Sequence, residues 1–451
     1  MDISVLYDIF LRCAAVTTDS RNCLAGSMFF ALRGDNFDGN AFALKALEAG
    51  CAYAVVDNIA KAPQVSDDKR LIVVDDTLAT LQELARLHRK TLGTRVICIT
   101  GTNGKTTTKE LTAAVLSKKF MVLYTKGNFN NHIGVPLTLL SLKPEHEIAV
   151  VEIGANHPGE IRDLAAIACP DFGLITNVGN AHLEGFGSFE GVVKTKGELY
   201  DYLRDTGGKI FVNANDEILT GMAAERCTVA SYTTHQDSIP GALNIIGRLS
   251  TAHPYVSFIW RQNADKSTDY QVATRLVGSY NMLNALAAIT IGVYFGVPEQ
   301  EICAAIAEYI PTNNRSQLKQ TACNTLIIDA YNANPSSMRA TLENFASLKS
   351  SPKAVILGDM LELGAKSDEL HVEILELIAA SNIDKVLLVG EIFASATAKK
   401  RGNIDEKYQE FAYFKNVEDL AARLVENPLH GYNILIKGSH GIHLENIIEL
   451  L

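Results

Sequence analysis

The stretch VICITGTNGKTTT, residues 96–108, decides how this chain is organised. An apolar run ends in a glycine-bounded turn that carries Lys105, Thr106 and Thr107, and the helical pattern KELTAAVLSKKF follows. A strand, turn and helix in this order wrap backbone N–H groups around a phosphate, and the helix N-terminus adds partial positive charge. Lys105 suits terminal phosphate oxygens, and the Thr106 hydroxyl suits a magnesium ion. The stretch therefore predicts a nucleotide site made of Gly101, Thr102, Asn103, Gly104, Lys105, Thr106 and Thr107.

The turn is a shortened relative of the full P-loop. The full spacing would place a glycine at position 99, where this chain has Ile99. Short glycine-rich motifs also occur as structural turns, so a purely structural turn is the alternative interpretation.

Composition sets bounds on the class of protein. A chain of 451 residues exceeds the size of one compact core, so we expect several domains. Hydrophobic residues make up 47% and charged residues 20%, which is typical of globular proteins. The formal charge of −10 offers no overall basic field for a nucleic-acid backbone, so no nucleic-acid partner is expected.

The cysteines and the amino terminus indicate a cellular location. The eight cysteines form no CxxC pair and show no metal-site spacing, which indicates reduced thiols. The first residues, MDISVLYDIF, have an acid where a signal peptide would be basic, and no apolar run reaches membrane-spanning length. We therefore expect a soluble, cytoplasmic protein without membrane insertion.

Three α/β segments follow one another along the chain. Residues 1–85 combine the apolar runs SMFFAL, YAVV and LIVV with one helical stretch, and a helix over 77–92 leads onward. Residues 86–310 alternate strands and helices, which predicts a P-loop ATPase-like, mostly parallel sheet, with a β-rich part at 240–277. Residues 311–451 contain five strand candidates separated by helices and predict a Rossmann-like, doubly wound domain after a hinge at Pro311 and TNNRS.

Polar residues recur where the strands of the central segment end. They are Asn128, Asn130 and Asn131 after the second strand, Glu152 and Asn156 after the third, and Asn177, Asn180 and His182 after the fourth. Ligands bind outside the carboxyl ends of parallel strands, so these residues are expected to face one crevice.

Several of these side chains suit phosphoryl chemistry, each against a simpler alternative. Thr106 and Glu152 supply a hydroxyl and a carboxylate for a magnesium ion, and a carboxylate at the end of an apolar strand requires a partner. His182 is a candidate ligand or an ordinary loop histidine. Lys194 and Lys196 are interpreted from their spacing as a solvated helix face.

Two polar loops and the last segment are less decisive. The loops TTDSR (17–21) and LRGDNFDGN (32–40) fit ordinary turns as well as binding. In DAYNANPSSM (329–338), turn chemistry explains the asparagines but not Asp329 and Tyr331. Lys437, at the end of another strand, is a candidate for contact with an anionic ligand.

In order along the chain, these motifs resemble the Mur ligase family. The resemblance covers TDSR, FALRGDNFDG, GTNGKTTTKE, NFNNHIGVP, VEIGANHPGEI, TNVGNAHLEGFGS, KGELY, NNRSQ, DAYNANPSSM, LGDMLELG and KGSHG. GTNGKTT is shared across the wider superfamily, whereas DAYNANPSSM and LGDMLELG are typical of the branch that joins D-alanyl-D-alanine to UDP-N-acetylmuramoyl-tripeptide.

The resemblance implies an ATP-dependent ligase of peptidoglycan precursor synthesis. Its three domains would bind the UDP end of the substrate (1–85), ATP (86–310) and the incoming dipeptide (311–451). ATP would phosphorylate the substrate carboxylate, and the dipeptide amine would displace phosphate from the acyl phosphate. ATP and two Mg²⁺ ions are the implied cofactors, and a monomer is the implied state.

The resemblance also implies residue roles. Lys105, Lys196, His182 and Glu152 would be catalytic. The first metal would be held by Thr106 and Glu152, and the second by His182 and by Lys196 once it is carbamylated. ATP would meet the P-loop residues together with Asn281, Asn284, Arg315 and Asp329. Substrate would meet Ser20, Arg21, Asn128, Asn130, Asn131, Asn332, Asn334 and Lys437.

Some positions depart from the family pattern, and other functions stay open. Tyr280 and Asn40 stand where histidine is common, and His440 and His443 stand where arginine is common. A folylpolyglutamate synthase-like ligase would share the P-loop and the lysine but would lack the first domain and DAYNANP. A nucleotide-binding protein without catalysis would not need two metal sites.

Overall fold

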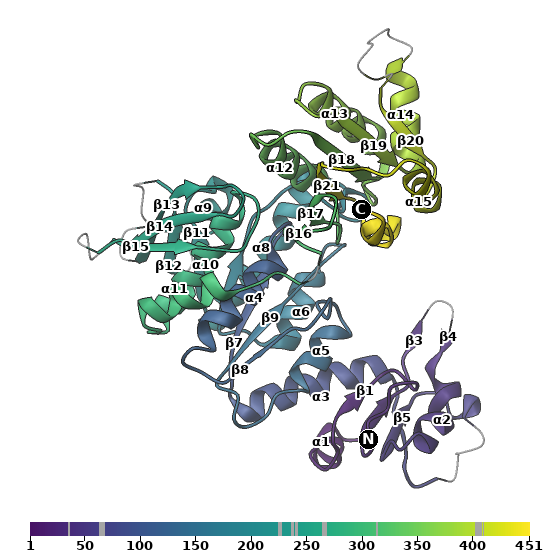
Figure 1. The fold of residues 1–451 in the computed structure, drawn as a ribbon. Coiled ribbons are helices and arrows are strands. Elements are labelled where there is room, and N and C mark those ends of the chain that lie inside the picture. Colours follow the sequence, from purple (N-terminus) through teal and green to yellow (C-terminus); the bar gives the residue numbers. More distant parts are fainter. Residues whose placement is uncertain are drawn as a thin grey trace.

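Three large β-sheets and one two-stranded hairpin make up the sheets of the described residues in the computed structural model (Figure 1). It describes residues 1–451 except 35–36, 63–67, 224–227, 236–238, 240–241, 264–267, 313, 402–407 and 409, and not the side chains of 399–401. Asp35 and Asn36 of the second polar loop and Asn313 of the expected hinge lie outside the described residues. We name the three parts the N-terminal, central and C-terminal domains.

The N-terminal domain is built on four parallel strands in the order β1-β2-β5-β6. On one face of the sheet, Phe29 and Ala54 pack against helix α2. On the other face, Phe30 and Val55 pack in the core that includes α1 and α3. The elements are α1 (Ile3–Phe10), β1 (Val16–Thr17), β2 (Met28–Phe30), the hairpin β3 (Arg33–Gly34) and β4 (Phe37–Asp38), η1 (Gly39–Phe42), α2 (Ala43–Glu48), β5 (Tyr53–Val56), η2 (Ile59–Lys61) and β6 (Leu71–Val73).

Helix α3 (Thr77–Leu92) joins the first two domains, with the bounds expected from its leucine stripe. The Asp76 side chain caps its start by accepting from Ala79 N at 2.7 Å, and Gly93 ends it in a left-handed conformation. Its buried face packs against α1 on one side and against α5 and α6 on the other. The expected domain boundary at 85–86 therefore falls inside a continuous helix.

The central sheet has nine strands in the order β15-β14-β13-β12-β11-β10-β7-β9-β8. Strands β7 to β13 pair in parallel, and β14 and β15 add an antiparallel edge. In β7, Val96 and Cys98 face one core, whereas Ile97 and Ile99 face another, so helices cover both sides of the sheet. The mostly parallel sheet expected from the sequence is confirmed.

The elements of the central domain run from β7 to α11. They are β7 (Arg95–Thr100), α4 (Lys105–Leu116), β8 (Val122–Tyr124), α5 (Gly134–Leu139), β9 (Ile148–Glu152), α6 (Glu160–Ala168), β10 (Phe172–Ile175), α7 (Leu183–Phe186), α8 (Phe189–Thr206), β11 (Lys209–Asn213), α9 (Glu217–Ala223), β12 (Thr228–Thr233), β13 (Leu243–Thr251), β14 (Ser257–Gln262), β15 (Tyr270–Ala273), α10 (Asn281–Tyr294) and α11 (Glu299–Glu308).

The C-terminal sheet has six strands in the order β16-β17-β21-β18-β19-β20, covered by helices on both faces. The five expected strands are confirmed as β17 to β21, and the sequence missed a sixth, β16, which pairs antiparallel with β17 at the edge. Its sequence, QLKQ, is short and polar and carries no apolar pattern. The doubly wound, parallel part of the expectation is confirmed.

The elements of the C-terminal domain run from β16 to η7. They are β16 (Gln317–Gln320), β17 (Thr325–Asp329), α12 (Pro335–Ala346), β18 (Lys353–Gly358), η4 (Gly364–Lys366), α13 (Ser367–Ala379), β19 (Lys385–Val389), α14 (Glu391–Arg401), β20 (Ala412–Phe414), α15 (Val417–Glu426), β21 (Asn433–Lys437), η6 (His440–Ile442) and η7 (Leu444–Leu450). Among the described residues, no helix has the length and apolar character needed to cross a membrane.

Candidate active site

A cavity of about 1030 Å³ lies where the carboxyl ends of the central strands face the C-terminal domain. Strand register explains why distant residues meet there, since Ile99 of β7 pairs with Glu152 of β9 and Thr100 pairs with Ile175 of β10. The predicted residues that line the cavity are Gly101, Thr102, Asn103, Gly104, Lys105, Thr106, Thr107, Asn130, Asn131, Glu152, Asn156, Asn177, His182, Lys196, Asn281, Asn284, Arg315, Asp329, Asn332, Asn334 and Lys437.

The turn between β7 and α4 is closed around Lys105. Lys105 Nζ donates to the carbonyl oxygens of Gly101 at 2.8 Å and Thr102 at 3.1 Å. Burial lowers the pKa of Lys105, and Glu152 opposes this shift. Gly104 has a left-handed φ of 77°, and a Cβ there would lie 2.4 Å from Asn284 Oδ1. Close approach of α10 therefore requires glycine at this position.

The end of β10 holds the tip of the same turn. Asn103 N donates to Asn177 Oδ1 at 2.9 Å. The Asn103 carbonyl accepts from Thr176 Oγ1 at 2.6 Å and from Asn177 Nδ2 at 3.0 Å. The backbone of the turn is thus fixed by the central domain, independently of the Asn103 side chain.

A hydroxyl and a buried carboxylate meet at the start of α4. Thr106 Oγ1 donates to Glu152 Oε2 at 2.8 Å, and Asn130 Nδ2 donates to Glu152 Oε1 at 2.9 Å. Glu152 is 1% exposed and takes part in none of the ion pairs among the described residues. Hard oxygen donors of this kind suit Mg²⁺, so Thr106 and Glu152 fit the first implied metal.

Lys196 lies on the cavity rather than in solvent. It is 3% exposed, whereas Lys194 on the same helix is exposed. The interpretation of Lys196 as part of a solvated helix face was therefore wrong. Its Nζ lies 5.4 Å from the centre of the Phe186 ring, and burial together with the nearby Lys105 ammonium lowers the pKa of Lys196 to about 7.

His182 is paired across the domain interface. Its Nδ1 lies 2.5 Å from Glu362 Oε2 of the C-terminal domain, and the adjacent His182 imidazole lowers the pKa of Glu362. In the described part of the chain, no three His, Cys, Asp or Glu side chains are grouped to hold a metal. A second metal would therefore need ligands of other kinds, such as a modified lysine or phosphate oxygens.

A second polar chain runs from α4 through α10. Thr108 Oγ1 donates to Asn284 Oδ1 at 3.2 Å, and Asn284 Nδ2 donates to Asn281 Oδ1 at 2.8 Å. Asn281 Nδ2 donates in turn to the Val277 carbonyl at 2.8 Å. The two asparagines are fixed by these bonds and leave little freedom for rearrangement.

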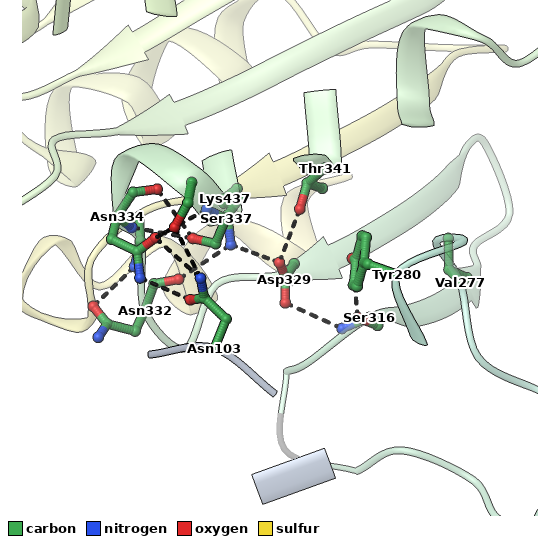
Figure 2. A network of polar contacts seen from close by, with 12 residues as sticks. Asn103, Val277, Tyr280, Ser316, Asp329, Asn332, Asn334, Ser337, Thr341 and Lys437 are labelled. Atoms are coloured by element: carbon green, nitrogen blue, oxygen red, sulfur yellow. Dashed lines mark hydrogen bonds and ion pairs between the residues drawn. The ribbon is translucent and has the colours of Figure 1, made fainter. Parts of the chain in front are cut away.

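The C-terminal domain contributes an ion pair between Lys437 and Asp329, which is part of the network in Figure 2, and a stacked arginine. Lys437 Nζ donates to Asp329 Oδ2 at 2.6 Å and to the Asn332 carbonyl at 3.2 Å, so its charge is already matched within the domain. Asp329 Oδ1 accepts from Ser316 N at 3.2 Å. The Arg315 guanidinium lies 3.7 Å from the centre of the Tyr331 ring.

Four predicted residues do not line the cavity, namely Ser20, Arg21, Asn128 and Asn180. Ser20 and Arg21 lie in the N-terminal domain, where Arg21 forms a bidentate pair with Asp19. Hydrogen bonds from Arg21 lower the pKa of Asp19 to about 2. Asn128 is exposed beyond the end of β8.

Sequence reasoning missed several residues that meet this site from the C-terminal domain, and Ser336 and Glu362 are two of them. Ser336 contacts Asn103, and Glu362 contacts His182. Both lie inside quoted motifs, DAYNANPSSM and LGDMLELG, but only the relative placement of the domains reveals their partners.

The positions that depart from the family pattern are well accommodated. Asn40 is buried, and its Nδ2 donates to Asp38 at 2.7 Å and to Asp57 at 2.9 Å. Burial raises the pKa of Tyr280, whose hydroxyl lies 3.2 Å from Ser316 Oγ. The His440 ring stacks on Tyr331 at a centroid distance of 5.8 Å.

Comparisons with known proteins give a consistent assignment. The model of the Mur ligase family, catalytic domain, matches residues 12–89, that of the Mur ligase middle domain matches 99–292, and that of the Mur ligase, glutamate ligase domain, matches 314–440. The UDP-N-acetylmuramoyl-tripeptide–D-alanyl-D-alanine ligase of Bacillus subtilis (strain 168) is 36% identical over 96% of this chain and 92% of its own length. That of Escherichia coli (strain K12) is 36% identical over 97% and 93%.

Solved structures agree with the sequence relatives. A crystal structure of MurF from Acinetobacter baumannii superposes with a TM-score of 0.82 at 29% identity, covering 96% of this chain and 92% of that one. The MurF ligase of Thermotoga maritima in complex with ADP superposes with a TM-score of 0.79 at 25% identity, covering 98% and 97%. From its three matched domains and its full-length relatives, the chain belongs to the Mur ligase family.

Proposed function

We propose that this chain is an ATP-dependent ligase that joins D-alanyl-D-alanine to the tripeptide carboxylate of UDP-N-acetylmuramoyl-tripeptide, forming ADP and phosphate in peptidoglycan precursor synthesis. The observation that carries this function is one shared cavity. Lys105, Glu152 and Lys196 of the central domain face it together with Arg315 and Asp329. The relatives at 36% identity carry the name of this reaction, which favours it over a folylpolyglutamate synthase-like activity.

The reaction divides one difficult step into two. A carboxylate is a poor electrophile, so transfer of the γ-phosphoryl group from ATP to a carboxylate oxygen first gives an acyl phosphate and ADP. The dipeptide amine then attacks the acyl carbon, loses a proton and expels phosphate. Positioning and cationic stabilisation of the phosphoryl group supply most of the acceleration in such reactions.

The residues around Lys105 suit nucleotide binding. The N-terminus of α4 and the turn N–H groups favour the β- and γ-phosphates, and Lys105 is placed beside them to neutralise charge. Arg315 and Asp329 reach the same cavity from the hinge and from β17, so docking of the C-terminal domain completes the site.

The residues present also fit divalent metal. Thr106 and Glu152 would hold one Mg²⁺, which supplies Lewis-acid stabilisation of phosphate oxygens when bound. His182 and Lys196 are proposed for a second site. The lowered pKa of Lys196 leaves much of its amine neutral near pH 7, and a neutral amine is the form that adds carbon dioxide. The resulting carbamate is anionic, so carbamylation would convert the Lys196 side chain from a cation into a group that can bind a metal ion.

The three domains are proposed to divide the substrates as the family does. Residues 1–85, with Ser20 and Arg21, would bind the uridine end, and residues 311–451 would bind the dipeptide. Because the cavity is completed within one chain, we propose that a monomer is active. Use of ATP and of a nucleotide-linked precursor supports a cytoplasmic location.

The function is tested by phosphate release from Mg-ATP. The parent chain should release phosphate only when UDP-N-acetylmuramoyl-tripeptide and D-alanyl-D-alanine are both present. Lys105→Ala should lower kcat at least 100-fold, whereas Lys194→Ala, on the exposed face of α8, should leave it unchanged. Release without the dipeptide, or equal rates for the parent and Lys105→Ala, would contradict the proposal.

A further inference from the structure

Two asparagines from different domains form an amide pair at the tip of the P-loop turn. Asn334 Nδ2 donates to Asn103 Oδ1 at 2.8 Å (Figure 2). Asn103 Nδ2 donates to Ser336 Oγ at 2.9 Å, and Ser336 Oγ donates to Asn334 Oδ1 at 2.9 Å. The three side chains close a ring of hydrogen bonds between the central and C-terminal domains.

The Asn103 side chain is not needed to shape the turn. Its backbone N–H and carbonyl are already bonded to Thr176 and Asn177 of the central domain. The side-chain amide is therefore available to contact the other domain. The residue next to it, Thr102, offers its carbonyl to Lys105 Nζ, so a shift of the tip would move a group that holds this lysine.

Asn334 is fixed relative to its own domain. It is the N-cap of α12, where its Oδ1 accepts from Ser337 N at 2.9 Å and Pro335 occupies the first helical position. This cap orients the amide so that Nδ2 faces Asn103. Protein N–H···O hydrogen bonds span about 2.7–3.2 Å and require good alignment, so the ring forms only when the C-terminal domain is docked close to this position.

We infer that Asn334 and Ser336 are positioning residues that act through Asn103, coupling docking of the C-terminal domain to the phosphoryl-transfer geometry of the P-loop. The inference rests on the proposed function, because it assumes that this turn holds the phosphates of ATP. The P-loop turn and α4, which are proposed to hold the phosphates, belong to the central domain, so we expect the ring to affect turnover more than nucleotide affinity.

The test compares Asn103→Ala, Asn334→Ser and the double variant with the parent. Serine keeps a capping oxygen for α12 but removes the amide that donates to Asn103. Arg339→Ala is the control, because Arg339 lies on α12 and pairs with Glu373 at 3.1 Å on the surface. Steady-state kinetics give kcat, and calorimetric titration of the enzyme alone with Mg-ATP gives Kd.

Each single variant should lower kcat about tenfold while Kd for Mg-ATP changes less than twofold, and the double variant should match the singles. Arg339→Ala should behave as the parent. Values of kcat within twofold of the parent, multiplicative losses in the double variant, or a Kd that rises as much as kcat falls would overturn the inference. If Asn334→Ser fails to fold, Asn103→Ala alone decides the matter. A parent enzyme without phosphate release would instead contradict the proposed function.

Discussion

His182 Nδ1 lies 2.5 Å from Glu362 Oε2, and this pair joins the loop after β10 to the C-terminal domain. Gly364 lies at the same contact, because a Cβ added there would lie 3.4 Å from the backbone of Glu184. The interface is therefore held by the contact of His182 with Glu362 and by the amide ring at Asn103. The two contacts lie on different motifs and can be tested separately.

Glu362→Gln tests the contact between His182 and Glu362 through its pH dependence. The pKa of Glu362 is lowered in the folded protein, so the pair stabilises it above the ordinary carboxyl range and this contribution is lost as pH falls through the lowered pKa. Because both side chains are partly exposed, the effect should stay below about 1 kcal/mol. The difference in melting temperature between parent and variant should shrink from pH 7 to pH 3. Glu373→Gln, on the far surface pair, is the control, and a difference that grows at low pH would reject this explanation.

Lys196→Met should stabilise the protein near and below pH 7. The pKa of Lys196 is lowered to about 7 in the folded protein, so between pH 7 and 10.5 the unfolded chain binds more protons than the folded one. Below pH 7 the buried ammonium therefore destabilises the fold. This loss of stability is recovered as the pH rises from 7 to 10.5. A shift of this size corresponds to a cost on the order of 4 kcal/mol at low pH. Denaturant unfolding at pH 6 and pH 9.5 should show a larger gain at pH 6, and the variant should be inactive.

Carbamylation of Lys196 has its own signature. A carbamate would form on the neutral amine, so ¹³C-labelled bicarbonate should give a protein carbamate resonance in the parent that is missing in Lys196→Met. Lys194→Met should keep the resonance, since its side chain is exposed. If the resonance were lost in Lys194→Met but kept in Lys196→Met, the carbamate would be on Lys194 and the proposal for Lys196 would be wrong.

Gly104→Ala separates steric contact from backbone strain. The added Cβ would lie 2.4 Å from Asn284 Oδ1, which is held by Thr108, at a φ of 77°. Gly207→Ala has a similar φ of 74° with open space around the Cβ and should cost only about 1–2 kcal/mol. Gly104→Ala should cost more and should weaken Mg-ATP binding at least tenfold. If the two variants lost the same free energy of unfolding, α10 would have moved away from the new Cβ and the steric explanation would be wrong.

Lys437→Met should destabilise the C-terminal domain by about 3 kcal/mol or more. Lys437 is 1% exposed and is paired with Asp329 at 2.6 Å, so its removal leaves the partly buried Asp329 carboxylate without its cation. Urea unfolding gives the loss, and the double variant Lys437→Met, Asp329→Asn should recover part of it. No recovery in the double variant would mean that packing of the lysine stem, rather than charge, explains the loss.

Much of the fold followed from the sequence because its signals are local. The apolar runs at 96–100 and 148–152 and the leucine stripe of α3 encode strands and a helix directly. Strand β16 carried no such pattern, because an edge strand with four half-exposed or exposed residues needs no apolar face. Its existence depends on pairing with β17.

The site was predictable in part for the same reason. Parallel strands place Thr106 and Glu152 at one edge of a sheet, and their hydrogen bond agrees with that expectation. The burial of Lys196 was not predictable from helical spacing, since Phe186 and Lys105 approach it from other segments. The contacts of Asn103 and His182 depend on how two domains dock, and no local pattern encodes docking.

The continuous helix α3 has a consequence for how the molecule can be taken apart. One cluster of buried apolar side chains runs from Phe10 of α1 through Leu84 of α3 to Leu164 of α6, so the first two domains share a core. Calorimetry should therefore record their melting as one cooperative transition. Chimeras that exchange the N-terminal domain between relatives would need to carry both faces of α3, because a junction at 85–86 would divide that core between two parents. Although the sequence motifs follow one another domain by domain, the first two domains therefore form one structural unit with a common core.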